Sequence, residues 1–323
     1  MPTKIAEAPT PSAQKPYGDE CLNDGDENLR PLNRDETLNH LQGCKRLPSL
    51  NTINSALRDL LSSEDSSAAE ISEIVRKDPS LTARLLRLVN SAYFGLSSSV
   101  NSVEEAVFFL GVRQVKQLAM TTPVIEDLQE MIKQTSFDWS EFWKHCIAVA
   151  VITREIASRI SEPSPDESDY LAGLLHDVGK IATAAVFPDR FVAIQNRVNR
   201  GDIDLLEAEK MYLGMDHSEI GATYLAAHNL PTQLVNVCQF HHTPYQATDS
   251  KDLIAIVHIA NAAIRGAEIG HSGNPNPMEP QAWLESPAWK MLAQSGPRIE
   301  IKAIQSEITT IVSRLPSLLD KIV

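Results

Sequence analysis

Apolar residues recur every three or four positions from Leu47 to the end of the chain, and this spacing constrains the fold more than any other feature. Such a period places the apolar side chains on one face of an α-helix. Leu50, Ile53 and Leu57 share a face in this way. Few runs show the strict alternation of a half-buried strand, and glycine is sparse, at 14 of 323 residues. The pattern predicts an all-α, multi-helical bundle of a dozen or more short helices.

Several helix ends can be predicted from their flanking residues. Ser168 is a plausible N-cap for the run ESDYLAGLLHDVGKIATAAV, and Asp216 is one for DHSEIGATYLAAHNLP. In PTQLVNVCQFHHTP, the two histidines stand at the end of the helix, and Pro244, two residues beyond His242, stops it. In SFDWSEFWKHCIAVAVITREIASRI, His145 falls on the apolar stripe and is expected to point into the protein.

The chain divides by composition into a polar tail and a helical body. Residues 1–45 are rich in Pro, Asn and Asp and have few apolar positions, so we expect a disordered N-terminal tail with at most a short helix near RDETLNHLQ. We predict one helical half over residues 46–135 and a second over 136–270. Residues 271–323 are expected to form C-terminal helices that pack on the second half.

Charge and cysteine content exclude several function classes. The net charge of −13 argues against a sequence-independent grip on nucleic acid, which needs a basic surface. No run approaches the roughly 18 apolar residues of a membrane span, and the first residues have no apolar signal-peptide core. The four cysteines are scattered, without metal-type CxxC spacing, so a disulfide framework is not expected. We therefore expect a cytoplasmic protein.

Five histidines and one aspartate stand out because each lies at a predicted helix end or on an inward stripe. They are His145, His176, Asp177, His217, His241 and His242. Imidazole and carboxylate are ligands that suit Zn, Fe, Mn or Ni. An adjacent His-Asp pair can bind one ion through the imidazole and bridge two ions through the carboxylate. The set predicts a site for one or two divalent ions; the alternative for His176 and Asp177 is a core pair held by hydrogen bonds.

Asp177 and Lys180 are the candidate catalytic residues. A divalent ion lowers the pKa of a bound water and so generates a nucleophile. Lys180 lies about one turn beyond the His-Asp pair, where it could neutralise a phosphate oxygen of a substrate. The alternative is a lysine in an ordinary salt bridge.

The motif LLHDVGK resembles the signature of HD-domain metal-dependent phosphohydrolases. The order of an upstream histidine, the HD pair, HSEIGA and FHH resembles the HD-GYP cyclic-dinucleotide phosphodiesterases, but TPYQATD follows in place of a Gly-Tyr-Pro element. The resemblance implies a last ligand, an aspartate, on a late helix. Asn261, a neutral and weaker ligand, stands there in VHIANAAIRG, and His258 one turn earlier is the other candidate.

The N-terminal half resembles the HDOD domain, the HD-related output domain of bacterial signalling proteins. The resemblance is carried by LPSLNTINSAL, IVRKDPSLTARLLRLVNSAYFG and SVEEAVFFLGVRQVKQLAM, and it covers roughly residues 40–245. It implies a stand-alone, largely non-catalytic regulatory protein that retains a metal site and acts through protein contacts. The implied partners are a histidine kinase, a response regulator or a diguanylate cyclase, and a nucleotide is a further candidate ligand.

An enzyme is the alternative to a regulatory protein. The nearly complete ligand set also suits a metal-dependent phosphohydrolase or phosphodiesterase acting on a nucleotide or cyclic dinucleotide. A di-iron oxygenase of HD type shares the same ligands and is a third candidate. An open cleft beside Lys180 would favour the enzyme, whereas a closed site would favour a scaffold stabilised by metal.

Overall fold

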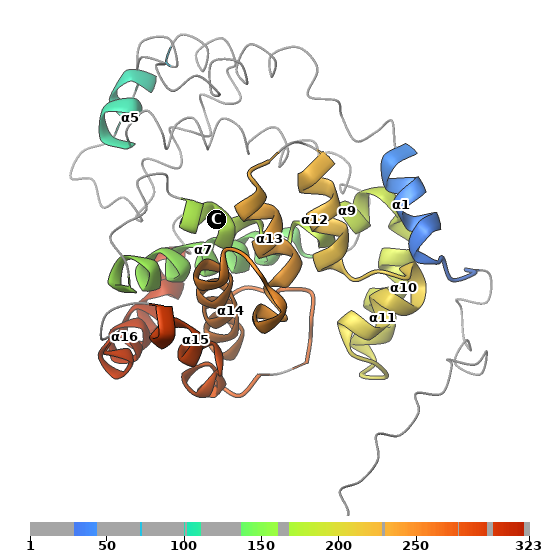
Figure 1. The fold of residues 1–323 in the computed structure, drawn as a ribbon. Coiled ribbons are helices and arrows are strands. Elements are labelled where there is room, and N and C mark those ends of the chain that lie inside the picture. Colours follow the sequence, from blue (N-terminus) through green and yellow to red (C-terminus); the bar gives the residue numbers. More distant parts are fainter. Residues whose placement is uncertain are drawn as a thin grey trace, which may run out of the picture. The chain divides into compact units, whose positions relative to one another are not determined.

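The computed structural model describes residues 29–43, 72, 100, 102–110, 137–160, 168–227, 230–276, 278–295 and 300–319. All regular structure within these ranges is helical, which confirms the all-α prediction (Figure 1). The α-helices are α1 (Arg34–Gly43), α5 (Val103–Leu110), α7 (Trp139–Ile160), α8 (Ser168–Leu175), α9 (Val178–Val186), α10 (Pro188–Asn199), α11 (Leu205–Leu213), α12 (His217–Ala227), α13 (Thr232–Phe240), α14 (Lys251–Gly266), α15 (Ala288–Ser295) and α16 (Ile301–Leu319). Two short 3-10 helices are η2 (Pro244–Gln246) and η3 (Ala282–Glu285).

Most of the predicted helical half at 46–135 lies outside the described residues. Within that range the structure describes residues 72, 100 and 102–110, which include α5. The motifs before residue 100 that carry the HDOD resemblance therefore remain sequence observations.

The long helix α7 forms a central part of the core, because it packs against α8, α14 and α16 (Figure 1). Its predicted apolar stripe is confirmed. The buried members of the stripe are Phe142, His145, Val149, Ile152 and Ile156. Burying each large apolar side chain contributes about 1.5–3 kcal/mol to folding. The same burial carries His145 into the interior.

The run predicted as one helix from Ser168 is instead two helices, α8 and α9, separated at His176 and Asp177. Asp177 precedes α9 with φ −102° and ψ 12°, and its side chain makes no capping bond to the helix. Its carboxylate faces the buried histidines instead. The break therefore lets two consecutive side chains turn toward one centre, which an unbroken helix would not allow.

Helices α9 and α12 touch through their glycines. A Cβ atom on Gly179 would lie 1.8 Å from the carbonyl oxygen of His217 and 2.7 Å from the backbone nitrogen of Gly221. Only a residue without a side chain permits this approach. The contact places the first turn of α12, and with it His217, beside the His-Asp pair.

The predicted N-cap of α12 is confirmed. The Asp216 side chain accepts a bond of 3.1 Å from the backbone N–H of Glu219, and the Glu219 side chain accepts one of 3.3 Å from the backbone N–H of Asp216. This reciprocal pair satisfies N–H groups that an isolated helix end leaves free. It fixes the point at which His217 leaves the loop.

Helix α1 lies at RDETLNHLQ, where the sequence allowed a short helix within the stretch 1–45 that was otherwise expected to be disordered. Leu32, Thr37 and Leu41 are buried, and the Thr37 hydroxyl donates to the carbonyl oxygen of Leu213 at 2.6 Å. Arg34 also forms an ion pair with Glu219. The weak helical pattern of this segment is sufficient because tertiary contacts with α11 and α12 stabilise it.

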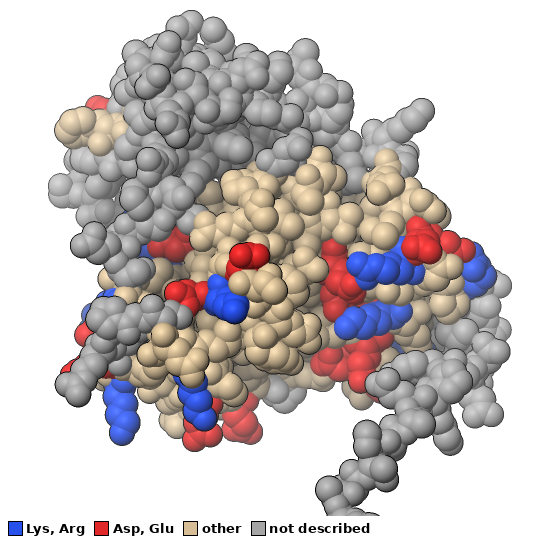
Figure 2. All heavy atoms as spheres, viewed as in Figure 1, with Lys and Arg blue, Asp and Glu red and all other residues tan. Residues whose placement is uncertain are grey.

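Figure 2 shows one face of the molecule, on which the basic and acidic side chains of the described residues are interspersed. None of the helices in the described ranges combines the length and apolar character needed to cross a bilayer.

Candidate metal centre

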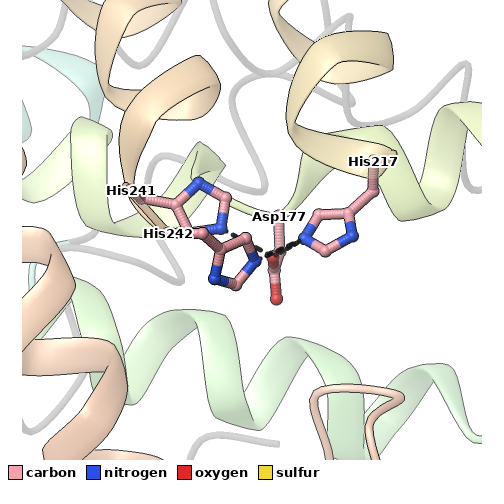
Figure 3. A group of neighbouring side chains, drawn as sticks. All are labelled: Asp177, His217, His241 and His242. Atoms are coloured by element: carbon pink, nitrogen blue, oxygen red, sulfur yellow. Dashed lines mark hydrogen bonds and ion pairs between the residues drawn. The ribbon is translucent and has the colours of Figure 1, made fainter. Parts of the chain in front are cut away.

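All five predicted histidines gather around the buried carboxylate of Asp177. The carboxylate of Asp177 is shared by two groups of potential ligands. One group adds His217, His241 and His242, and the other adds His145 and His176. Figure 3 shows the first group, in which the three imidazoles surround Asp177 from α12 and the end of α13. The structure therefore brings together six of the seven predicted metal ligands.

The group on the Oδ1 side of Asp177 is closely spaced. Oδ1 lies 3.2 Å from Nε2 of His217 and 3.5 Å from Nε2 of His241. The Nε2 atoms of His217 and His242 are 3.0 Å apart. His242 is half-buried, whereas the other three side chains in this group are fully buried.

The group on the Oδ2 side is looser and contains a lysine. Oδ2 lies 3.3 Å from Nε2 of His176 and 4.0 Å from Nε2 of His145. The Lys180 ammonium lies 2.6 Å from the same oxygen and donates to the carbonyl oxygen of Ser272 at 2.8 Å. Lys180 is only 4% exposed, so both of its partners are internal to the protein.

The Nδ1 atoms of His176 and His241 face backbone carbonyl oxygens rather than the Asp177 carboxylate. Nδ1 of His176 faces the Gly173 carbonyl at 2.7 Å, and Nδ1 of His241 faces the Cys238 carbonyl at 2.8 Å. Because a carbonyl oxygen can only accept, each Nδ1 carries the proton. A ring that carries its single proton on Nδ1 presents a bare lone pair at Nε2, which is the tautomer that a metal ligand needs.

Glu209 on α11 is the partner of Nδ1 of His217, as the carbonyls are for His176 and His241. The sequence interpretation did not include Glu209. Its Oε2 lies 2.7 Å from Nδ1 of His217 and accepts the backbone N–H of His217 at 2.9 Å. Glu209 is 3% exposed. A signal was present in the sequence, because an acid stands on the apolar face formed by Leu205, Ala208 and Tyr212.

The protonation states of the cluster suit cation binding. Burial lowers the pKa of His241 to about 4, and it holds the pKa values of His145 and His242 well below their usual range. Burial also acts to raise the pKa of Asp177, but the charges of His176 and Lys180 outweigh it and keep that pKa well below its usual range. An ionised carboxylate beside the neutral imidazoles of His145, His241 and His242 offers donor atoms of the kind that a divalent ion requires.

His217 behaves differently from its neighbours. Burial acts to lower its pKa, but the Glu209 carboxylate and the contact with Asp177 outweigh burial and raise the pKa to about 9. In the absence of a metal this ring is therefore cationic near neutral pH. A divalent ion must displace that proton to bind Nε2, so ion and proton compete for the site.

Asn261 and His258 lie on α14. Asn261 is buried, and no described residue hydrogen-bonds to its Oδ1. Its role as a ligand stays a prediction. Nδ1 of His258 lies 2.8 Å from the carbonyl oxygen of His241, so this ring contacts the backbone of a ligand rather than Asp177.

The unpaired atoms of the cluster fit a bound metal. Nε2 of His145, His176 and His241 and Oδ1 of Asp177 are buried without a hydrogen-bond partner among the described residues. Buried polar atoms without partners are costly, and facing lone pairs repel unless a cation lies between them. A divalent ion between Nε2 of His241 and Oδ1 of Asp177 would satisfy both of these atoms.

The HDOD domain family matches residues 47–244, more than half of the chain. The chain belongs to the HDOD domain family. An uncharacterised protein from Treponema pallidum is 25% identical to this HDOD protein over 220 residues, which are 68% of this chain and 42% of the relative. The chain therefore spans less than half the length of that relative.

Three crystal structures share the fold of this HDOD protein. An HDOD domain protein of unknown function from Geobacter sulfurreducens has a TM-score of 0.75 and 23% identity, over 90% of this chain and 99% of its own. A candidate phosphohydrolase from Shewanella amazonensis has a TM-score of 0.67 and 24% identity, over 89% and 98%. A candidate signal transduction protein from Marinobacter aquaeolei has a TM-score of 0.66 and 21% identity, over 91% and 62%. At these identities the similarity establishes the shared fold.

Proposed function

We propose that this HDOD protein is a regulatory component of bacterial signalling that acts through protein–protein contacts and is stabilised by a buried divalent metal ion. The observation that carries the proposal is the closed ligand set around Asp177. His217, His241, His242 and Asp177 offer four ligand atoms to one point. Structural zinc sites are filled by four protein ligands, whereas catalytic sites keep a position open for water or substrate.

The environment of Lys180 supports the same proposal. A lysine that binds a substrate phosphate needs a free ammonium at the edge of a cleft. Here the ammonium is buried and donates to Asp177 and to the Ser272 carbonyl. Both bonds would have to break before this residue could contact a phosphate, so Lys180 is better suited to an internal role.

The partner classes follow from the family rather than from this site. Fold alone does not determine function, and one similar structure belongs to a candidate signal transduction protein. We propose a histidine kinase, a response regulator or a diguanylate cyclase as partner, with a nucleotide as a further candidate ligand. A cytoplasmic location suits the buried free thiols of Cys146 and Cys238.

A metal-dependent phosphohydrolase is the second candidate. Its support is the pair of ligand groups that face the two oxygens of Asp177, together with the half-buried position of His242. A bound divalent ion would supply a Lewis acid and lower the pKa of a coordinated water. Asp177 would then hold the ion, and Lys180 would contact a nucleotide or cyclic dinucleotide phosphate.

Metal analysis and a hydrolysis assay test the proposal together. The full chain is purified without an affinity tag, beside a variant that carries both His176→Ala and Asp177→Ala. We expect bound Fe, Mn, Zn or Ni in the wild type, less in the variant, and no hydrolysis of cyclic dinucleotides by either protein. Hydrolysis by the wild type that disappears in the variant would replace the regulatory proposal with the phosphohydrolase.

A further inference from the structure

The two oxygens of Asp177 have different surroundings. The His217 and His241 imidazoles lie beside Oδ1, with His242 next to His217, whereas two imidazoles and one ammonium group accompany Oδ2. The ammonium belongs to Lys180, and its distance to Oδ2 is 2.6 Å. It is the shortest contact that either oxygen makes within the cluster. A cation of the protein itself is therefore already bound at one of the two oxygens.

The Oδ1 group has the spacing of a tetrahedral site. Ligands about 2.0–2.1 Å from a zinc ion at tetrahedral angles lie about 3.3 Å from one another. Three of the six separations among the four ligand atoms are 3.0 Å, 3.2 Å and 3.5 Å, and all six lie within 4.8 Å. His217, His241, His242 and Asp177 thus offer four ligand atoms for one coordination sphere, which would form as the more widely spaced atoms draw together.

The Oδ2 group does not complete such a sphere. His145 and His176 supply two nitrogens, and the His145 nitrogen is 4.0 Å from Oδ2. An ion bound to Oδ2 would lie about 2.0–2.2 Å from it and so next to the Lys180 ammonium. Like charges at this distance repel strongly where water is excluded. The ammonium cannot move into solvent easily, because Lys180 is 4% exposed and the Ser272 carbonyl also holds it.

We infer that the protein binds a single divalent ion, held by Asp177 Oδ1, His217, His241 and His242, and that the Lys180 ammonium takes the place of a second ion at Asp177 Oδ2. This inference rests on the proposed metal centre and assigns its occupancy. It gives Lys180 a structural role. This role differs from both roles expected from the sequence, which are a phosphate contact and an ordinary salt bridge. His145 and His176 then line the lysine-filled half and bind no metal.

Metal stoichiometry tests the role of the lysine. The full chain is stripped with a chelator, reconstituted with excess Zn²⁺, dialysed and analysed by mass spectrometry. We expect one ion per chain in the wild type and two in Lys180→Met, which removes the charge but keeps an unbranched side chain. Lys210→Met is the matched control, because it also removes a lysine paired with an aspartate, Asp216, and should retain one ion. A Lys180→Met protein that stays at one ion would overturn the inference.

Two further variants test the position of the ion. His217→Ala should lose the ion, whereas His176→Ala should keep it. The opposite result would place the ion in the other half and would overturn the inference. Anomalous scattering from wild-type crystals grown with Zn²⁺ locates the ion without any variant, which matters if Lys180→Met or His217→Ala does not fold.

The number of ions bound by the wild type distinguishes a failure of the single-ion inference from a failure of the proposed metal centre. Two ions per chain would overturn the single-ion inference and leave the metal centre in place. A folded wild type that binds none after reconstitution would overturn both the inference and the proposed metal centre.

Discussion

Nδ1 of His217 lies 2.7 Å from Oε2 of Glu209, and the backbone N–H of His217 donates to the same oxygen at 2.9 Å. These two bonds orient the ring so that Nε2 lies 3.2 Å from Asp177. The chain brings the pair together through Gly214, which ends α11 in the left-handed region at φ 64°. A carboxylate behind an imidazole fixes its tautomer and raises its basicity as a ligand.

Replacing Glu209 should weaken metal binding without removing a ligand. We expect Glu209→Gln to lower the affinity by about 10–100-fold, because partners behind metal ligands typically have effects of this size. A competition titration with a chromophoric chelator measures the change. Glu207→Gln on the same helix is the matched control, since Glu207 is exposed. Equal affinities for the two variants would contradict a supporting role for Glu209.

The metal-free protein should be most stable near neutral pH. The pKa of His217 is about 9 in the folded protein and about 6.5 in an unfolded chain, so its stabilisation is complete below about pH 6.5 and is lost as the pH rises through about 9. The loss is on the order of 3 kcal/mol at most. His241, with a pKa of about 4, has the opposite effect, because only the unfolded chain takes up its proton between about pH 6.5 and 4.

Urea unfolding in a chelator, near pH 5, 7 and 9, checks both limbs of this profile. Glu209→Gln should flatten the decline between about pH 7 and 9, because it removes the charge that raises the pKa of His217. Stability that increases from about pH 7 to 9 in the wild type would refute the assignment.

Gly179→Ala should lower stability and metal content, although Gly179 is not a candidate metal ligand. Its new Cβ would overlap the carbonyl oxygen of His217, so α12 must shift away from α9. Overpacking of this kind costs about 1–3 kcal/mol, and the shift should also lower metal content. Gly201→Ala is the control, because its Cβ meets no atom within 4 Å and only the strain of φ 76° is added. A fully metallated Gly179→Ala protein with wild-type stability would show that the contact is not required.

Thr37→Val should lower the free energy of unfolding by about 1 kcal/mol. The substitution keeps the buried shape but removes the hydroxyl that bonds to the Leu213 carbonyl. Thr309→Val is the matched control, because its hydroxyl bonds within an exposed turn of α16 and should change stability by less than about 0.5 kcal/mol. Chemical denaturation of both variants measures the difference. Equal effects would mean that α1 contributes little to the body.

The sequence alone determined the helical class and most of the candidate ligand set. The 3.6-residue period predicted α7 and the inward face that carries His145, since a period reports directly which residues share a face. Capping chemistry is equally local, so Asp216 could be assigned before the structure. The HD pair and the later histidines could be recognised by type and order.

Tertiary structure decided how these groups are used. Glu209 meets His217, Lys180 meets the Ser272 carbonyl, and Thr37 meets the Leu213 carbonyl, and none of these pairings is signalled by sequence spacing. The break between α8 and α9 likewise arises because the Asp177 carboxylate turns toward the buried histidines. The hydrophobic period and the helix caps depend on residues that are close together in the sequence. Charge pairing and burial depend on which distant segments pack together. Only the folded chain brings the Lys180 ammonium to one oxygen of Asp177 and the His217 and His241 imidazoles to the other.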